Sequence, residues 1–319
     1  MFDLPALRRA ADLIRPTVAP TPQLAWPLLA ERLGCEVWVK HENHTPTGAF
    51  KVRGGLVYLD ELLRREPSVR GLVTATRGNH GQSLALAARR AGLPIHILVP
   101  QGNAREKNAA MRAFGAEVIE QGRDFDEVRE AAIRLAEARG LHLVPALHAD
   151  LVRGVATYAL ELFEAVPDLR RVYVPIGLGS GICGLIRTRD LLGLDTEIVG
   201  VVARGADAYA QSFEQGRAVC TDRADTFADG VACRVPQDEA LALIRDGAAR
   251  ILRVDDEEIR QAIRVLHEDT HNLAEGAGAV ALAALMQERG RNAGERVAVV
   301  LSGANIDRQA LAAILAAGD

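Results

Sequence analysis

The residues of this chain best suited to covalent chemistry lie in one segment, Lys40-His41-Glu42-Asn43-His44-Thr45-Pro46-Thr47-Gly48-Ala49-Phe50-Lys51. Lys51 follows an aromatic side chain within a turn rich in threonine and glycine, and Arg53-Gly54-Gly55 comes after one further residue. A lysine amine held against apolar side chains and backbone dipoles can lose its proton near neutral pH and attack a carbonyl carbon. Taken alone, the segment is equally compatible with a loop followed by an amphipathic helix.

A second polar segment reads Thr74-Ala75-Thr76-Arg77-Gly78-Asn79-His80-Gly81-Gln82 and stands between an expected strand and an expected helix. Exposed N–H groups at the N-terminus of a helix bind anions, and the two flanking glycines let a ligand approach the backbone. The segment would therefore suit a small carboxylate. An ordinary strand-to-helix turn is the simpler alternative.

Two further motifs follow expected strands in the C-terminal half. The first, Gly177-Leu178-Gly179-Ser180-Gly181, precedes an expected helix. Its glycines let consecutive amides converge on phosphate oxygens, so a phosphate site is favoured over a bare turn. The second, Leu301-Ser302-Gly303-Ala304-Asn305, ends the last expected strand and offers the Ser302 hydroxyl. Alone it is weak, because Ser-Gly after a strand is usually a turn.

Strand-like and helix-like segments alternate around these motifs, which is typical of parallel sheets covered by helices. We expect an α/β fold of two lobes, each a mostly parallel sheet flanked by helices. The small lobe would span 71–147 and the large lobe 1–70 plus 148–319, with the ligand between them. Strands are expected at 37–40, 71–75, 95–99, 117–119, 171–176, 197–202 and 296–301, and helices at 52–65, 83–90, 105–114, 125–139, 151–165, 182–192, 255–272 and 278–288.

Composition restricts the partners of the protein. The 319 residues carry 38 basic and 42 acidic side chains, a formal charge of -4 without a basic run, which argues against nucleic acid. No apolar run approaches the roughly 18 residues of a membrane helix, and the N-terminus lacks the features of a signal peptide, so a cytoplasmic protein is expected. The cysteines, Cys35, Cys183, Cys220 and Cys233, are too scattered for metal-ligand spacing, and free thiols without a metal are expected.

Together, the four motifs suit an aldehyde that has a phosphate tail and a ring nitrogen needing only a neutral partner. Pyridoxal 5'-phosphate is that molecule. The order of the motifs resembles that of the tryptophan-synthase-β-like, or fold type II, pyridoxal-phosphate enzymes. Within these, the chain most resembles the serine/threonine dehydratase and serine racemase family, and the resemblance covers essentially its whole length.

The resemblance implies a lyase, a dehydratase that converts an L-β-hydroxy amino acid of the threonine or serine type into a 2-oxo acid and ammonia by α,β-elimination. Lys51 would bind the cofactor covalently and later move the α-proton. Asn79 would hydrogen-bond the phenolic oxygen of the ring, and Ser302 would meet the ring nitrogen. The phosphate would be held by Gly177, Leu178, Gly179, Ser180 and Gly181. The cofactor site would also include Phe50 and Glu275. The substrate would contact Thr76, Arg77, Asn79 and His80. A homodimer is also implied.

Several positions depart from the family pattern. Ala49 replaces the usual serine and removes one hydroxyl contact. Arg77 stands where the resembling serine racemases place a serine that protonates the opposite face of the carbanion. Arginine cannot serve as that base, so racemisation is disfavoured, and phenylserine or 3-hydroxyaspartate remain alternative substrates. Arg204 lies close to the position where the family often carries a cation-binding glutamate, which argues against a metal. The chain ends at Asp319 soon after its last helix, so a short, catabolic-type enzyme is expected.

Other interpretations stay open at this point. Residues 179–184 fit the dinucleotide motif GxGxxG and Arg204 follows the next strand, so an NADP-dependent oxidoreductase is the strongest rival. That interpretation leaves Lys51 and Asn79 without a role. An amino-acid racemase and a non-catalytic pyridoxal-phosphate carrier are further alternatives. A cysteine synthase is less favoured, because the carboxylate loop of cysteine synthases resembles Thr-Ser-Gly-Asn-Thr, whereas this chain reads Thr-Arg-Gly-Asn-His.

Overall fold

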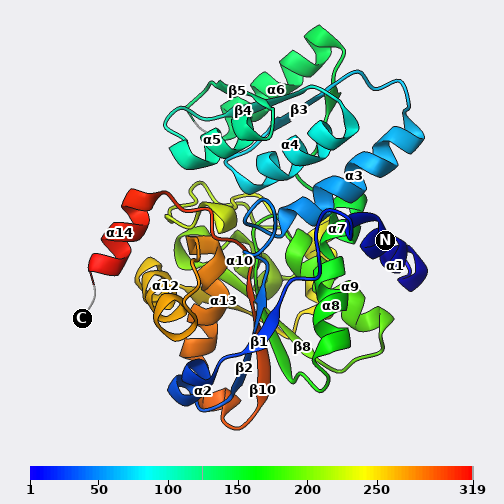
Figure 1. Cartoon of the computed structure of the whole chain (residues 1–319). Coiled ribbons are helices and arrows are strands. Elements are labelled where there is room, and N and C mark those ends of the chain that lie inside the picture. The colour runs from blue at the N-terminus through cyan, green and yellow to red at the C-terminus, as the bar shows by residue number, and fades with distance from the viewer. Residues whose placement is uncertain (124, 318–319) are drawn as a thin grey trace.

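A large and a small β-sheet form the framework of the two lobes (Figure 1). The computed structural model describes residues 1–123 and 125–317, without the side chains of residues 125 and 126. The small sheet is parallel, with the order β5-β4-β3-β6. Its strands are β3 (Leu72–Ala75), β4 (Ile95–Val99), β5 (Glu117–Glu120) and β6 (His142–Leu143).

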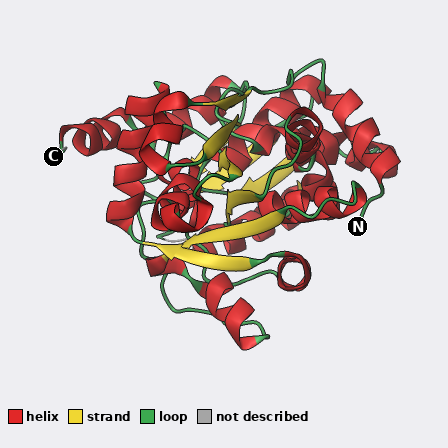
Figure 2. Ribbon diagram, turned by 90° about the horizontal axis from the view of Figure 1, so that it is seen from below, coloured by secondary structure: helices red, strands yellow, loops and turns green. Residues whose placement is uncertain are grey.

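The large sheet has the order β1-β2-β10-β7-β8-β9, in which β1 runs antiparallel to β2 and the other neighbours are parallel. Its strands are β1 (Gln23–Ala25), β2 (Glu36–His41), β7 (Arg171–Pro175), β8 (Glu197–Ala203), β9 (Arg250–Val254) and β10 (Arg296–Leu301). Figure 2 shows these strands enclosed between helices.

Helices connect the strands and cover both sheets. They are α1 (Leu4–Ile14), α2 (Pro27–Leu33), α3 (Lys51–Arg65), α4 (Asn79–Ala91), α5 (Arg105–Ala113), α6 (Phe125–Arg139), α7 (Ala149–Val155), α8 (Thr157–Ala165), α9 (Ser180–Leu191), α10 (Ala208–Gln215), α11 (Asp238–Gly247), α12 (Asp256–Thr270), α13 (Gly276–Gln287) and α14 (Arg308–Ala316), with short 3-10 turns η1 (Arg204–Ala206), η2 (Asp229–Val231) and η3 (Arg289–Asn292).

The inner strands β7, β8 and β10 of the large sheet are buried on both faces, which explains why they are nearly continuous apolar runs. Side chains alternate along a strand, so successive residues of β10 enter different cores. Val297 and Val299 pack in a core with residues of α12 and α13. Ala298 and Val300 pack in a second core with residues of α7, α8 and α9.

The paired glycines of α3 let this helix contact its neighbours backbone to backbone. A Cβ atom on Gly54 would lie 2.8 Å from the carbonyl oxygen of Leu151 in α7. A Cβ atom on Gly55 would overlap the side chain of Ser83 in α4, whose hydroxyl donates 2.6 Å to the Lys51 carbonyl oxygen. The helix that begins at Lys51 is therefore held between the two lobes.

The predicted α/β class with two mostly parallel sheets is confirmed. Two predicted helices need correction. The helix expected from Ser83 already begins at Asn79. The helix expected over 151–165 is divided into α7 and α8 at Ala156, where the Thr157 hydroxyl donates 2.7 Å to the Gly154 carbonyl oxygen. The division of the chain at residues 71 and 148 stays a prediction, and Asp319 lies outside the described residues.

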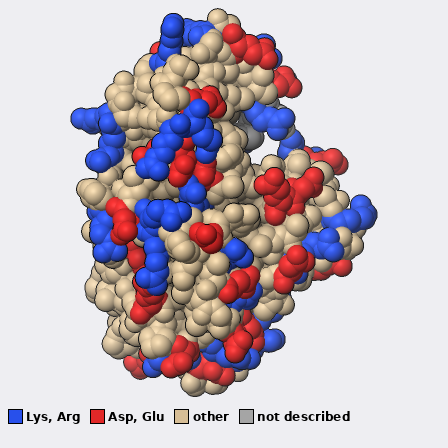
Figure 3. Space-filling model, turned by 90° about the vertical axis from the view of Figure 1, so that its right-hand side faces the viewer, with Lys and Arg blue, Asp and Glu red and all other residues tan. Residues whose placement is uncertain are grey.

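On the face drawn in Figure 3, basic and acidic side chains lie next to one another rather than in separate patches. No helix in the described part of the chain is long and apolar enough to cross a membrane.

Candidate active site

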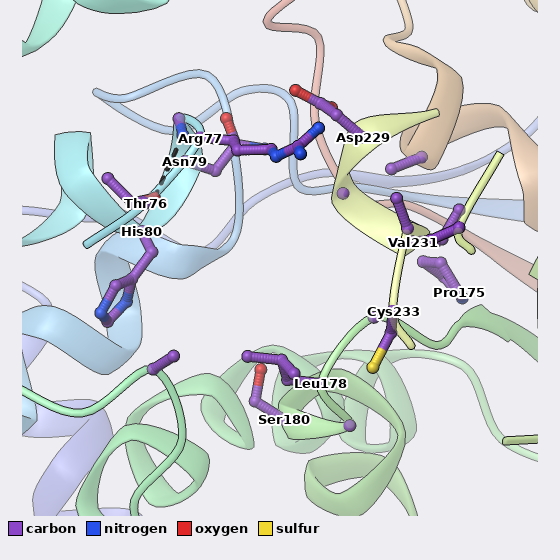
Figure 4. Close-up of a pocket in the computed structure, with 18 of the residues that line it drawn as sticks. Thr76, Arg77, Asn79, His80, Pro175, Leu178, Ser180, Asp229, Val231 and Cys233 are labelled. Atoms are coloured by element: carbon purple, nitrogen blue, oxygen red, sulfur yellow. Dashed lines mark hydrogen bonds between the residues drawn. The ribbon is translucent and has the colours of Figure 1, made fainter. Parts of the chain in front are cut away.

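A cavity of about 580 Å³ lies at the carboxyl ends of strands from both sheets, the usual ligand position in open α/β sheets (Figure 4). Its lining includes Ala75 at the end of β3, Pro175 at the end of β7, and Ser302 just after β10. The fold thus brings together every site residue that the sequence predicted, and their individual roles remain predictions. These residues are Phe50, Lys51, Thr76, Arg77, Asn79, His80, Gly177, Leu178, Gly179, Ser180, Gly181, Glu275 and Ser302.

The turn before Lys51 is tightly fixed. Gly48 has φ +66°, a left-handed conformation that glycine adopts easily. The Thr45 hydroxyl accepts from the Ala49 N–H at 3.0 Å and lies 2.9 Å from the Ala49 carbonyl oxygen, to which it can donate. The Phe50 N–H donates 3.1 Å to the Ser302 carbonyl oxygen, which ties the turn to the end of β10. Lys51 therefore begins α3 at a position determined by both segments.

The Lys51 amine reaches the cavity without meeting a carboxylate. Its Nζ lies 2.8 Å from Ser180 Oγ and 4.8 Å from the centre of the Phe50 ring. Desolvation lowers the pKa of Lys51 from 10.5 to about 8. The neutral, nucleophilic fraction at pH 7 is thereby raised about a few hundredfold over that of an ordinary lysine.

Lysine is rare in this chain, and its three copies differ in their partners. Lys40 is fully buried, and its ammonium lies 2.6 Å from a carboxylate oxygen of Glu161. Lys107 lies 2.6 Å from a carboxylate oxygen of Asp229. Lys51 alone among the three lysines combines access to the cavity with the lack of a carboxylate partner.

The predicted phosphate loop is a rigid cradle at the start of α9. A Cβ atom on Gly177 would overlap the carbonyl oxygen of Gly230, and Gly179 has φ +102°. The Tyr209 hydroxyl donates 2.9 Å to the Leu178 carbonyl oxygen and the Tyr158 hydroxyl 3.0 Å to that of Gly181. The N–H groups of the first helical turn are left to bind an anion.

The predicted carboxylate loop lies at the start of α4. Thr76 Oγ1 accepts from the Gly78 N–H at 3.1 Å, and Asn79 and His80 occupy the first helical turn. Burial lowers the pKa of His80 to about 3, so its ring is neutral, and its buried Nε2 has no partner among the described residues. The ring points away from Arg77 and Asp229 (Figure 4). The loop can therefore bind a carboxylate through its N–H groups, and His80 adds no positive charge.

A polar network that the sequence analysis did not find crosses the cavity between the lobes. Asn79 Nδ2 donates 2.5 Å to Glu275 Oε1, and the other oxygen of Glu275 lies 3.3 Å from Lys107 Nζ. Lys107, from α5 of the small lobe, also donates to Asp229 in η2. Burial raises the pKa of Glu275, although the Lys107 charge opposes this. The rarity of lysine was the signal that could have identified Lys107.

A second network lies behind the Lys51 turn. The Arg53 guanidinium donates to both oxygens of Glu42 at 2.8 and 3.0 Å and to both oxygens of Glu161 at 2.7 and 2.8 Å. Arg53, Glu42 and Lys40 are completely or almost completely buried. The two cations of this network, Lys40 and Arg53, thus balance the two carboxylates. Arg53 stands two residues after Lys51, the proposed nucleophile.

Comparison with known proteins identifies the family. A family model described as "Pyridoxal-phosphate dependent enzyme" matches residues 14–303. The chain belongs to this family. The L-threonine ammonia-lyase of Geobacter sulfurreducens is 35% identical over 319 residues, all of this chain and 79% of that protein. Threonine deaminase isoform 2 of Solanum lycopersicum superposes with a TM-score of 0.90 at 29% identity and covers 100% of this chain and 95% of that chain. Maize serine racemase superposes with a TM-score of 0.90 at 27% identity and covers 98% of this chain and 96% of that chain.

The residues of this pyridoxal-phosphate-dependent enzyme fit the cofactor. The glycine cradle suits the phosphate, the desolvated Lys51 amine suits the aldehyde, and the unpartnered His80 Nε2 leaves a polar atom for a ligand. Ser302 Oγ, which is buried and 3.3 Å from the Ala277 carbonyl oxygen, offers a neutral hydroxyl for the ring nitrogen. The family assignment also removes the reason to interpret residues 179–184 as a dinucleotide motif.

The lowered pKa of Lys51 predicts how pH affects cofactor attachment. Covalent attachment needs the neutral amine, so its rate should rise about tenfold per pH unit below about pH 8 and level off above it. The rate is measured from the visible absorption that develops when apoenzyme is mixed with pyridoxal phosphate. A rate that continues to rise to about pH 10, as for an ordinary lysine, would contradict the prediction.

Proposed function

We propose that this enzyme is a lyase, an ammonia-lyase (dehydratase) that converts an L-β-hydroxy amino acid of the threonine or serine type into a 2-oxo acid and ammonia. The observation that carries the proposal is the desolvated Lys51 amine, 2.8 Å from Ser180 at the start of α9 and facing the cavity. The 35% identity to the L-threonine ammonia-lyases of Geobacter sulfurreducens and Thermotoga maritima supports the substrate class.

Bound pyridoxal phosphate supplies the electron sink that acidifies the α-hydrogen of the substrate. With the substrate amine in its place on the cofactor, the freed Lys51 Nζ would accept that proton as general base. The electron pair of the Cα–H bond would form the Cα=Cβ double bond while the Cβ–O bond breaks. The hydroxyl would take up one proton, balanced by the one that Lys51 has accepted, and leave as water. Hydrolysis of the C–N bond then gives the 2-oxo acid and ammonia.

The surrounding residues orient these groups. The N–H groups at the start of α4 would hold the substrate carboxylate, and Asn79 would donate to the phenolic oxygen of the cofactor ring. The neutral Ser302 hydroxyl cannot stabilise a protonated ring nitrogen as a carboxylate would. With Ser302 as its partner, the ring would draw less charge from Cα, which would favour prompt loss of the β-hydroxyl.

The proposal is tested with a panel of L- and D-β-hydroxy amino acids. Holoenzyme should release equal amounts of 2-oxo acid and ammonia from L-threonine or L-serine. D-isomers should react far more slowly, because the amine acts from one side of the substrate. If no member of the panel yields a 2-oxo acid while the cofactor is bound, the proposed ammonia-lyase activity is wrong.

A second candidate substrate is one with an anionic or bulky β-substituent, such as 3-hydroxyaspartate or phenylserine. Arg77 favours a substrate with an anionic group. Its exposed guanidinium extends across the cavity toward Asp229 (Figure 4). No carboxylate among the described residues lies within ion-pair distance of it. A guanidinium binds a carboxylate through two parallel hydrogen bonds.

Replacing Arg77 with alanine should therefore change substrate preference rather than overall chemistry. We expect kcat/KM for 3-hydroxyaspartate to fall at least about tenfold relative to that for threonine, the loss of one charged hydrogen bond. The ratio is measured across serine, threonine, 3-hydroxyaspartate and phenylserine. An unchanged ratio would show that Arg77 does not select the β-substituent.

Racemase activity should be minor, because the guanidinium of Arg77 has no acceptor atom that could exchange a proton with the substrate. Chiral chromatography of unreacted L-serine would show D-serine if this were wrong. A homodimer in the cytoplasm, without nucleic acid or membrane partners and without a catalytic metal, completes the proposal. Sedimentation of the holoenzyme tests the dimer.

A further inference from the structure

We propose that Asn305 is a positioning residue that determines which end of the Asn79 side-chain amide faces the cofactor. The inference rests on the proposed function, in which Asn79 donates to the phenolic oxygen of the ring. Asn305 lies in the segment between β10 and α14 and is absent from the cavity lining, so it would act through Asn79 and not by contact with the ligand.

The orientation of Asn305 follows from a backbone group. Asn305 Nδ2 lies 2.8 Å from the carbonyl oxygen of Thr47. A carbonyl oxygen accepts hydrogen bonds and cannot donate them, so this end of the Asn305 amide must be the NH2 group. The reverse orientation would place two acceptors against each other.

The orientation of Asn79 then follows from Asn305. The same Nδ2 of Asn305 lies 2.8 Å from Asn79 Oδ1. Because Asn305 donates there, the facing atom of Asn79 must be its oxygen, and the opposite end must be its NH2 group. That NH2 group lies 2.5 Å from Glu275 Oε1 and at the cavity. One of its two hydrogens can serve Glu275, which leaves the other for the cofactor.

Glu275 reinforces this orientation only while it is ionised, because a carboxylate accepts hydrogen bonds and cannot donate them. A protonated carboxyl group can donate as well as accept, and burial raises the pKa of Glu275 toward the protonated form. Glu275 would then tolerate either end of the Asn79 amide. The Thr47 carbonyl has no such freedom, so the chain of bonds from Thr47 through Asn305 selects the donor end of Asn79.

Asn305 is itself held in place. The Ala304 N–H donates 2.9 Å to the Gly48 carbonyl oxygen. A Cβ atom on Gly48 would lie only 2.8 Å from Asn305 Oδ1, so glycine is needed at position 48 for this approach as well as for its positive φ. The side-chain amide of Asn305 therefore links three segments, namely the turn before Lys51, the end of β10 and the start of α4.

The test replaces Asn305 with aspartate, which has the same shape but cannot donate, and with leucine, which removes the amide without adding charge. In both N305D and N305L, Asn79 loses its fixed orientation. The dissociation constant of pyridoxal phosphate should rise about tenfold to a hundredfold, the value of a hydrogen bond to a charged group. The absorption maximum of the bound cofactor should also shift, because its phenolic oxygen loses a donor.

The chain offers a matched control. Asn103 Nδ2 donates 2.6 Å to Asn108 Oδ1, an asparagine pair of the same kind outside the cavity lining. N103D should leave cofactor affinity and absorption unchanged. Thermal unfolding of each apoenzyme monitors the fold, and two variants at position 305 ensure that a folding defect in one does not decide the result.

A double-mutant cycle separates positioning from general structural damage. If Asn305 acts through Asn79, then N305L should weaken cofactor binding in the native background but add little to N79A. Additive losses would overturn the inference, and so would native affinity and absorption in folded N305D and N305L. Failure of the unsubstituted protein to bind pyridoxal phosphate would instead refute the proposed function, and this inference with it.

Discussion

The Lys51→Ala variant should lose at least about a thousandfold in kcat/KM for β-hydroxy amino acids, because it removes both the nucleophile and the general base. The variant should fold normally, since Lys51 makes no ion pair that would be broken. Activity is measured by 2-oxo acid release at saturating pyridoxal phosphate. The apoenzyme's thermal unfolding provides the check on folding.

The covalent role of Lys51 can be separated from its role in proton transfer. Borohydride reduction of the holoenzyme followed by peptide mapping should place the cofactor on Lys51 and leave Lys40 and Lys107 unmodified. The mapping is decisive, because the chain has only these three lysines. Cofactor on Lys40 or Lys107, or more than a tenth of native activity in the alanine variant, would contradict the assignment.

The Arg53→Met variant should lose about 3–5 kcal/mol of unfolding free energy. Methionine fills a similar space, but Glu42 and Glu161 would share only the Lys40 charge in a nearly water-free site. Breaking a buried ion pair by removing one partner leaves an uncompensated charge, which is why the cost is large. Urea denaturation of the apoenzyme measures the loss.

Arg8 provides the matched control for Arg53. It makes one ion pair with Glu164 at 3.1 Å, and both side chains are about half exposed. The same change, Arg8→Met, should cost less than about 1 kcal/mol, because water screens exposed pairs. Similar losses in the two variants would show that the buried network is not what holds the Lys51 helix.

The parts of the site that lie in continuous motifs were predictable from the sequence. Lys51, Asn79 and Gly179 each stand at the junction of a strand or turn and a helix, where local residue types indicate exposed N–H groups or an activated amine. Parallel strands bring such junctions to one edge of each sheet, and a ligand site between two lobes brings the two edges together. The family model matches residues 14–303, a range that includes all of these motifs.

The contacts of the supporting residues were not predictable, because they join pairs far apart in the chain. Lys107 contacts Asp229 across 122 positions, and Asn305 contacts Asn79 across 226. Asn305 ends the Ser302 motif and Lys107 is one of three lysines, but no local pattern indicates the partner of either residue. The start of α4 was misplaced for a different reason: its N-cap, Gly78, lacks the side-chain cap that usually marks a helix start in a sequence.

The scarcity of lysine affects how this protein can be handled. Lys40 and Lys107 are buried in ion pairs, whereas Lys51 faces the cavity without one. Among the lysines, amine-directed labels should therefore react at Lys51 alone, and bound pyridoxal phosphate should protect it. The same reagents applied to the apoenzyme would count its vacant cofactor sites.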